Sequence, residues 1–290
     1  MLVVKMKSKQ FEVLKRASLF LQENKCEPKV AELLLQHHLS LNKTEFITNM
    51  RQAVPEDVIN KFRADLKRHV ETGVPLQHLT GYEYFYNRKF HVNKDVLIPR
   101  PETEELVEKA IIHLKRLSLE EEITVIDVGT GSGVIAITLA LEVPHLTVVA
   151  TDISEASLQL AEKNAKKHGA KVTFLKGDFL QPFIDTGKRA QMIVSNPPYI
   201  SYDEKGELSR TVVEHDPELA LFAGNNGLAA YETIIKQAKE TISQDGFLLF
   251  EIGHTQGEKV KQLISSTFPH SEVEILKDIN DFDRIVYARV

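Results

Sequence analysis

The chain has 290 residues, a net charge of −5, 42% hydrophobic residues and 27% charged residues, which is typical of a globular protein and excludes wholesale disorder. Its single cysteine, Cys26, excludes an intrachain disulfide and a zinc cluster built from cysteines, and no apolar run approaches the roughly 18–20 residues needed to cross a bilayer. The 11 histidines show no metal-ligand spacing, so no bound metal is expected. The mild acidity argues against a protein dedicated to binding duplex DNA.

Residues 1–76 are expected to form a first, all-helical domain. They carry a net charge of +4, against −9 for the rest of the chain, and this asymmetry indicates a separate unit. Apolar residues recur at helical spacing, as in Val58, Ile59, Phe62 and Leu66 after the helix start at Pro55. We expect a small helical bundle; the alternative is a docking module for a partner such as RNA or a ribosome-bound protein.

Residues 77–97 are expected to form a hairpin linker. The segment is rich in aromatic and β-branched residues, and its alternation predicts two short strands that turn at Asn87–Arg88 and contain Tyr84, Tyr86, Phe90 and Val92.

Residues 98–290 are expected to form an α/β domain. Its predicted strands are 123–128, 147–151, 172–175, 192–195, 247–252, 273–276 and 284–289, and its predicted helices are 102–116, 133–142, 154–168, 228–243 and 256–267. This alternation predicts a doubly wound, mostly parallel, seven-stranded sheet. No long helix separates the last two strands, which indicates an antiparallel edge.

A glycine-rich loop, Gly129-Thr130-Gly131-Ser132-Gly133, follows the first strand of this sheet. Glycines permit a tight turn and close approach of the backbone to a ligand, at the strand ends where open α/β sheets bind ligands. The spacing differs from the dinucleotide fingerprint, and no Lys-Ser/Thr pair follows as in a P-loop. Asp152, at the end of the second strand, can accept both ribose hydroxyls of a nucleoside, and Asp127 can attract a cation such as an amino group. Together these residues indicate S-adenosylmethionine rather than NAD.

The segment Gly177-Asp178-Phe179 follows the third strand, in the loop that would flank an adenine ring. Asp178 can accept hydrogens of the adenine amino group, and Phe179 can pack on the ring. The alternative interpretation is a turn residue followed by an ordinary core phenylalanine.

The fourth strand ends in Asn196-Pro197-Pro198-Tyr199. Two prolines end a strand because they lack backbone donors, so a rigid exit turn is the simplest interpretation. The segment also suits methyl transfer to a planar nitrogen, whose two N–H bonds need two fixed acceptors. The Asn196 side-chain oxygen and the Pro197 carbonyl can serve, and Tyr199 offers an aromatic face. Both hydrogen bonds strengthen as the nitrogen becomes positive, which favours the transition state over the ground state. The positive nitrogen then loses a proton easily, so no strong general base is required.

These motifs resemble those of class I S-adenosylmethionine-dependent N-methyltransferases, which have a Rossmann-like fold. A wider set resembles the release factor glutamine methyltransferase family. It comprises Gln77-His78-Leu79-Thr80-Gly81, Leu97–Val107 with its Pro101-Glu102-Thr103-Glu104 sequence, Asp216–Leu221, and Gly227-Leu228 with Tyr231. Together with the helical N-terminal unit, the resemblance covers nearly the whole chain. Ala223 and Asn226 depart from the family pattern, where a glycine and an aspartate are expected.

The resemblance implies that the chain methylates the side-chain nitrogen, N5, of the glutamine in the Gly-Gly-Gln motif of class 1 peptide chain release factors. It implies a cytoplasmic enzyme that converts S-adenosyl-L-methionine to S-adenosyl-L-homocysteine and recognises its substrate through residues 1–76. The implied cofactor contacts are Asp127, the loop Gly129–Gly133, Asp152, Asp178, Phe179 and Asn196. Asn196, Pro197 and Tyr199 are the implied catalytic residues, and Asn196–Tyr199, with Pro198, would hold the glutamine. The region of Arg100 would close over the site, with an ion pair to Glu102 or Glu104 as the alternative.

Two related activities remain alternatives at this point. A glutamine methyltransferase acting on a ribosomal protein shares the Asn-Pro-Pro-Tyr chemistry, although the Pro101-Glu102-Thr103-Glu104 sequence favours the release-factor branch. An adenine-N6 methyltransferase of nucleic acid is a weaker alternative, because the catalytic part of this chain is acidic. A nucleoside-binding scaffold without enzymatic activity would have no need of the Asn196–Tyr199 segment.

Overall fold

The computed structural model describes residues 8–117 and 123–290. The chain forms two compact units: one contains the residues up to Gly81 together with Arg210–His215, and the other contains Tyr82–Ser209 and Asp216–Val290. Among the described residues, no helix is both long and apolar enough to cross a membrane.

The first unit is helical, as predicted. It contains α1 (Gln10–Glu23), α2 (Lys29–Leu39), α3 (Lys43–Thr48), α4 (Glu56–Thr72), α5 (Leu76–Thr80) and the later helix α10 (Arg210–His215). Its core is a single apolar cluster that includes Leu21, Leu34, Leu35, Phe46 and Phe62, all fully or almost fully buried. Local signals set the helix ends: Asn42 and Glu45 form a capping box at α3, and Gly73 ends α4 in the left-handed conformation.

The predicted hairpin is present, with its turn one residue earlier than expected. Strands β1 (Tyr82–Phe85) and β2 (Arg88–His91) are antiparallel, and Phe85 pairs with Arg88. The turn residues are therefore Tyr86 and Asn87, with φ of 50° and 60°. Positive φ at both central positions matches the twist of a two-residue hairpin, which fixes the turn at this pair. Phe85 and Phe90 are buried, whereas Tyr84 remains 59% exposed.

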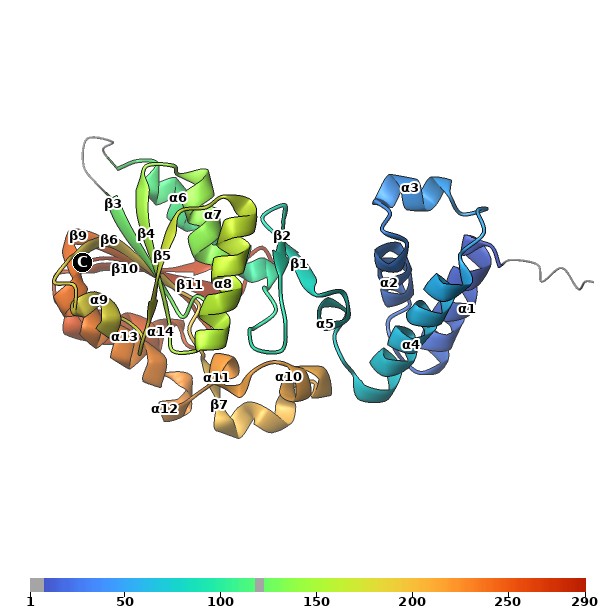
Figure 1. The fold of residues 1–290 in the computed structure, drawn as a ribbon. Helices are drawn as coiled ribbons and strands as arrows, with labels where there is room; N and C mark the ends of the chain where they lie inside the picture. Colours follow the sequence, from blue (N-terminus) through green and yellow to red (C-terminus); the bar gives the residue numbers. More distant parts are fainter. Residues whose placement is uncertain (1–7, 118–122) are drawn as a thin grey trace, which may run out of the picture. The chain divides into compact units, whose positions relative to one another are not determined.

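The second unit is built on the predicted seven-stranded sheet, in the order β10-β11-β9-β6-β3-β4-β5 (Figure 1). Neighbours from β9 to β5 are parallel, whereas β11 is antiparallel to both β9 and β10 and so forms the expected antiparallel edge. The strands are β3 (Ile123–Val128), β4 (Leu146–Asp152), β5 (Val172–Lys176), β6 (Ala190–Ser195), β9 (Ile242–Glu251), β10 (Glu272–Lys277) and β11 (Asp283–Arg289). The central strands β3 and β6 are almost wholly buried, as parallel strands covered on both faces are.

Helices cover both faces of the sheet (Figure 1). On one face, α6 (Pro101–Leu114), α7 (Val134–Glu142) and α8 (Glu155–His168) contribute to one apolar cluster, which also takes in Phe85 and Phe90 of the hairpin. On the other face, α9 (Gln181–Ile184), α13 (Ala229–Thr241) and α14 (Gly257–Thr267) contribute to a second cluster. This is the doubly wound α/β architecture that the sequence predicts.

The segment between Tyr199 and Ala229 contains short elements that the sequence pattern did not predict. They are β7 (Ile200–Ser201), the 3-10 helix η1 (Tyr202–Glu207), α10, α11 (Glu218–Leu221), β8 (Phe222–Ala223) and α12 (Gly224–Gly227). Strands β7 and β8 pair in parallel and hold the segment together. Elements of two to six residues are too short to show a hydrophobic period, so only tertiary contacts define them.

Gly227 is the tightest point of this segment. It has φ of 80°, and a Cβ atom there would lie 2.0 Å from the Tyr199 carbonyl oxygen and 2.7 Å from Nε2 of Gln256. The same carbonyl accepts a hydrogen bond of 2.8 Å from Gln256 Nε2. The absence of a side chain at Gly227 therefore lets the chain pack directly against the end of the Asn196–Tyr199 segment.

We predict that Gly227→Ala destabilises the protein by at least about 2 kcal/mol, because the new methyl group clashes with backbone and the φ value is strained. Urea denaturation measures the change. Gly206→Ala is the matched control: a Cβ atom there meets nothing within 4 Å, so its effect should stay within about 0.5 kcal/mol. Equal stabilities of the two variants would contradict the prediction.

Candidate functional site

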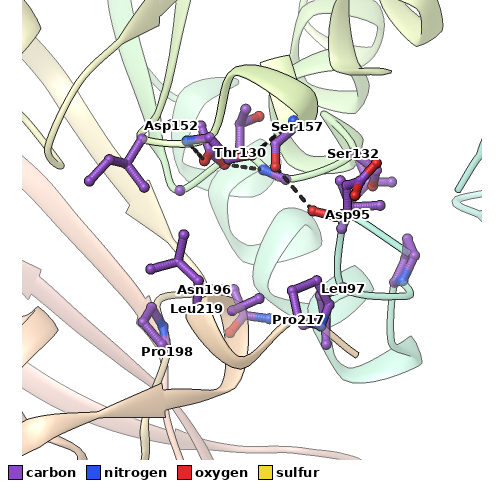
Figure 2. A pocket seen from close by; sticks show the side chains of 18 of the residues that line it. Asp95, Leu97, Thr130, Ser132, Asp152, Ser157, Asn196, Pro198, Pro217 and Leu219 are labelled. Atoms are coloured by element: carbon purple, nitrogen blue, oxygen red, sulfur yellow. Dashed lines mark hydrogen bonds between the residues drawn. The ribbon is translucent and has the colours of Figure 1, made fainter. Parts of the chain in front are cut away.

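A cavity of about 390 Å³ lies at the carboxyl ends of the parallel strands. Its wall includes the glycine loop after β3, Asp152 after β4, Asp178 and Phe179 after β5, and Asn196 and Pro198 after β6. Figure 2 shows Asp152, Thr130 and Ser157 on one side of the cavity and Asn196, Pro198 and Leu219 on the opposite side. The sheet topology thus brings together residues that are far apart in the sequence, as open parallel sheets do at this edge.

The structure favours glycine at the three loop positions for different reasons. All have positive φ: 73° at Gly129, 54° at Gly131 and 85° at Gly133. Cβ atoms at Gly129 and Gly131 would meet nothing within 4 Å, and both residues line the cavity. A Cβ atom at Gly133 would instead lie 2.8 Å from Ile137 Cδ1 and 3.0 Å from Ala161 Cβ. The first two glycines leave room for a ligand, whereas Gly133 permits close packing of α7 on α8.

Asp152 connects the end of β4 to the glycine loop. Its Oδ2 accepts a hydrogen bond of 2.9 Å from the Gly131 backbone N–H, and its Oδ1 accepts one of 2.8 Å from Ser154 N–H. Burial raises the pKa of this carboxyl, and the backbone hydrogen bonds oppose that effect. A half-buried carboxylate with remaining acceptor capacity at the cavity wall suits a ligand that presents hydroxyl groups.

Asp127 is fully buried beneath the loop and is outside the set of described residues that line the cavity. Its Oδ2 accepts hydrogen bonds from Thr130 Oγ1 at 2.6 Å and from Ala136 N–H at 3.1 Å, which tie the loop to the first turn of α7. Burial raises the pKa of Asp127 to about 7 despite these two bonds. In this structure the residue therefore organises the loop from below.

Asp178 and Phe179 both line the cavity, as the adenine interpretation requires. Phe179 has φ of 46°, a conformation that costs a non-glycine residue roughly 1–3 kcal/mol and that concentrates at functional sites. Its ring is half-buried against the second apolar cluster. The neighbouring Leu180 N–H donates to Gln237 Oε1 at 2.7 Å, which fastens this loop to α13.

The Asn196–Tyr199 segment leaves the central strand β6 at the cavity. The preceding Ser195 is buried, and its hydroxyl donates to the Val128 carbonyl at 2.7 Å, which joins the ends of β6 and β3. Asn196 and Pro198 line the cavity, whereas Pro197 and Tyr199 do not belong to the described lining. Burial raises the pKa of Tyr199 to about 12, so its phenol stays neutral. The structure thus places Asn196 and Pro198 at the cavity directly, and Pro197 and Tyr199 next to them in the chain.

Arg100 lines the cavity but pairs with neither Glu102 nor Glu104. Its Nη2 lies 2.7 Å from Oδ2 of Asp216, whose side chain is 2% exposed. Glu104 instead accepts the Tyr86 N–H at 2.7 Å. The ion pair of Arg100 ties the start of the 216–221 segment to the entrance of α6, and Pro217, Leu219 and Ala220 complete that side of the cavity.

Several lining residues were not among the site residues expected from the sequence. Lys94–Leu97 and Pro99 come from the loop before α6, Thr103 from its first turn, and Pro217, Leu219 and Ala220 from the loop around α11. The only sequence signal for them is that Leu97, Pro99, Thr103 and the 217–220 stretch lie within segments that resemble the family. Their residue types carry no chemical pattern of their own.

The raised pKa of Asp127 predicts a stability effect. Between about pH 5 and pH 7 an unfolded aspartate is ionised while the folded one keeps its proton, so the folded state binds more protons and stability falls as pH rises. We predict that Asp127→Asn weakens the fall in Tm between about pH 5 and pH 8. Glu251, whose pKa is also raised to about 7, leaves part of the fall in place. Asp185→Asn, at an exposed position outside the cavity, is the control, and identical profiles for all three proteins would contradict the prediction.

Comparisons with known proteins agree with this architecture. The PrmC N-terminal domain matches residues 12–81, and the Methyltransferase small domain matches residues 108–219. The catalytic domain of hMettl16 in complex with the MAT2A 3'UTR hairpin 1 shares the fold, with a TM-score of 0.53, 16% identity and 83% coverage of each chain.

Curated relatives match over almost the whole chain. The release factor glutamine methyltransferase of Bacillus cereus is 45% identical over 280 residues, which cover 97% of this chain and 99% of the relative. The enzyme of the same name from Bacillus subtilis is 45% identical over 281 residues and 97% of each chain. The enzyme of the same name from Neisseria gonorrhoeae is 37% identical over 264 residues, which cover 90% of this chain and 93% of the relative. This chain belongs to the release factor glutamine methyltransferase family.

Proposed function

We propose that this enzyme transfers a methyl group from S-adenosylmethionine to N5 of the glutamine in the Gly-Gly-Gln motif of class 1 peptide chain release factors. The curated relatives, named for this type of substrate, support the proposal. The structural observation that carries it is the Asn196 carboxamide on the cavity wall, opposite Asp152 and the glycine loop (Figure 2). This arrangement supports a site in which the Asn196 side-chain oxygen accepts a hydrogen bond from the substrate amide beside the bound cofactor.

The cavity fits S-adenosylmethionine, the cofactor of this methyltransferase. Its volume of about 390 Å³ is in the range of small-molecule sites. Gly129 and Gly131 leave open space on its wall, Asp152 offers a carboxylate for ribose hydroxyls, and Asp178 and Phe179 on the same wall suit contacts to an adenine. When bound, the cofactor supplies an electrophilic methyl group on a sulfonium and is left as S-adenosyl-L-homocysteine. The protein residues hold it and orient the acceptor.

The acceptor nitrogen of glutamine needs orientation, because its lone pair is delocalised into the amide. In the proposed site, the Asn196 side-chain oxygen and the Pro197 carbonyl accept its two N–H bonds and aim the lone pair at the methyl group. As the N–C bond forms, the nitrogen becomes positive and both hydrogen bonds strengthen, which lowers the barrier. The methylated nitrogen then loses a proton to solvent. The neutral Tyr199 phenol supplies an aromatic face to this segment and takes no part in proton transfer.

The remaining assignments belong to the same proposal. Residues 1–76 recognise the release factor, residues 77–97 link the domains, and residues 98–290 carry the catalysis. The net charge of +4 on the first segment suits a partner with acidic surface or a ribosomal setting, whereas stable binding to duplex DNA is not expected. The single cysteine and the translation-related substrate support a cytoplasmic location.

The proposal is tested with labelled S-adenosylmethionine and three purified acceptors: a class 1 release factor, a ribosomal protein with a methylatable glutamine, and DNA. We expect label only on the release factor, and none after its Gly-Gly-Gln glutamine is changed to alanine. Label on the ribosomal protein or on adenine in place of the release factor would establish one of the alternatives and overturn the proposal.

Asn196→Ala is predicted to lower kcat by roughly 10²–10³, by analogy with the loss of one oriented hydrogen-bonding group in a catalytic site. Calorimetry should show little change in the Kd of S-adenosylmethionine. Asp152→Ala is the reciprocal variant and should raise that Kd by about 10- to 100-fold, since it removes a charged acceptor. Near-normal turnover of Asn196→Ala, or an unchanged Kd for Asp152→Ala, would remove the respective residue from its role.

A further inference from the structure

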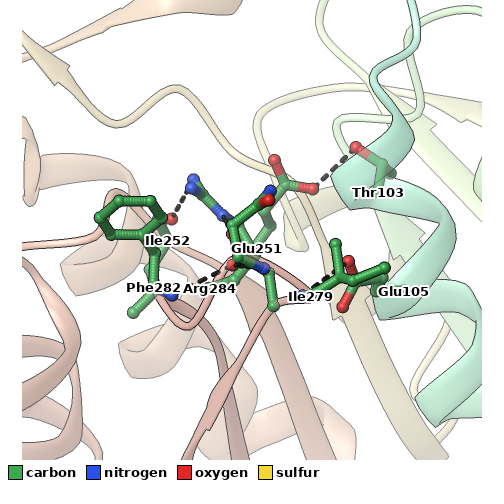
Figure 3. A network of polar contacts seen from close by, with 9 residues as sticks. Thr103, Glu105, Glu251, Ile252, Ile279, Phe282 and Arg284 are labelled. Atoms are coloured by element: carbon green, nitrogen blue, oxygen red, sulfur yellow. Dashed lines mark hydrogen bonds and ion pairs between the residues drawn. The ribbon is translucent and has the colours of Figure 1, made fainter.

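Three side chains form a continuous hydrogen-bonded chain from the protein core to the cavity. Asn196 Nδ2 lies 3.1 Å from Thr103 Oγ1, and Thr103 Oγ1 lies 2.7 Å from Glu251 Oε2. Asn196 follows β6, Thr103 is in the first turn of α6, and Glu251 ends β9, so three separate elements meet here. Figure 3 shows the Glu251 carboxylate directed towards Thr103. Thr103 and Glu251 are almost completely buried, at 3% and 2% exposure.

The chemistry of these groups determines which one donates and which one accepts each hydrogen bond. In its ionised form the Glu251 carboxylate only accepts hydrogen bonds, so the single hydroxyl proton of Thr103 is then donated to it. The oxygen of Thr103 can then accept a hydrogen bond, and an N–H of the Asn196 carboxamide donates it. The nitrogen of that carboxamide therefore faces Thr103. Its oxygen, on the other branch of the side chain, remains available to a ligand in the cavity.

A buried glutamate in this position is costly for the fold. Burial raises the pKa of Glu251 to about 7, and Glu102 adds to the rise, whereas Arg284 and the hydrogen bonds from Thr103 and Asn196 lower it. Arg284 is itself held by Asp278, with Nε 3.1 Å from Oδ2. Arg284 also donates a hydrogen bond of 3.2 Å to the Ile252 carbonyl (Figure 3). The fold thus supplies a cation and two donors to a buried carboxylate, an arrangement that packing alone does not require.

We propose that Thr103 and Glu251 are positioning residues that fix the orientation of the Asn196 carboxamide, with its oxygen presented to the N–H of the substrate amide. This inference rests on the proposed function, because it explains how the Asn196 side-chain oxygen is oriented to accept the substrate N–H in that reaction. A carboxamide has two nearly isosteric orientations, and the wrong one would face the substrate N–H with another N–H. The hydrogen bonds that link Glu251, Thr103 and Asn196 select the productive orientation before the substrate binds.

The test compares Thr103→Val with Thr103→Ser and a control. Valine keeps the shape of threonine but removes the hydroxyl, so we expect kcat for release factor methylation to fall by about 10- to 100-fold, as for loss of a supporting hydrogen bond. The Kd of S-adenosylmethionine, measured by calorimetry, should be nearly unchanged. Thr103→Ser retains the hydroxyl and should restore most of the turnover. Thr138→Val makes the same change at a fully buried threonine of α7 whose hydroxyl has no partner among the described residues, and it should leave kcat unchanged.

Combined variants establish that Thr103 and Glu251 act through Asn196. If they do, neither Thr103→Val nor Glu251→Gln causes a further loss in an Asn196→Ala background. Independent, multiplicative losses in these double variants would overturn the inference.

A spectroscopic measurement separates this inference from the proposed function. In the wild-type protein one Asn196 side-chain N–H, assigned by its absence in Asn196→Ala, should be protected from solvent exchange, and the protection should be lost in Thr103→Val. This readout needs no methylation substrate. A wild-type enzyme that fails to methylate the release factor overturns the proposed function. Wild-type activity together with unchanged kcat and unchanged Asn196 protection in Thr103→Val overturns the positioning role alone.

Discussion

The parallel register of β9, β6, β3 and β4 is the constraint on which the site depends. Ser195 pairs with Val128 and Val128 with Thr151, so the residues that follow these strands emerge side by side at one edge of the sheet. The Ser195 hydroxyl and the Asp152 carboxylate then join adjacent loops by hydrogen bonds. Apolar clusters cover both faces of the sheet. If one strand slid along its neighbours, polar groups would enter these clusters, so the register is fixed.

Polar residues around the cavity divide into those that face it and those that support it. Asp152, Asp178 and Asn196 line the cavity, whereas Asp127 and Glu251 are buried beside it and hold Thr130 and Thr103. Burial raises the pKa of both supporting carboxyls to about 7, so folded stability falls as they ionise with rising pH.

Much of the catalytic domain could be predicted from the sequence, because its strands are long enough to show an apolar run and are separated by amphipathic helices. The bounds of β3 were predicted to the residue, and those of β4, β5 and β10 to within one. The turn of the hairpin was misplaced by one residue, since aromatic alternation alone does not reveal that Tyr86 adopts positive φ. The elements between Tyr199 and Ala229 went unpredicted, because Gly227 and its close approach to Tyr199 become meaningful only in three dimensions.

The residue types of the chain already define the chemistry available to this protein: a glycine-rich loop, a carboxylate after the second strand, and an Asn-Pro-Pro-Tyr segment suited to an amide nitrogen. These signals are local, since each consists of consecutive residues whose types limit backbone and hydrogen bonding. Long-range packing, by contrast, pairs Arg100 with Asp216, which is 116 residues away. It also places Thr103 between Asn196 and Glu251, which are 93 and 148 residues away from it. Such pairs follow from how helix α6 packs at the ends of β6 and β9, and no short-range pattern in the chain encodes that packing.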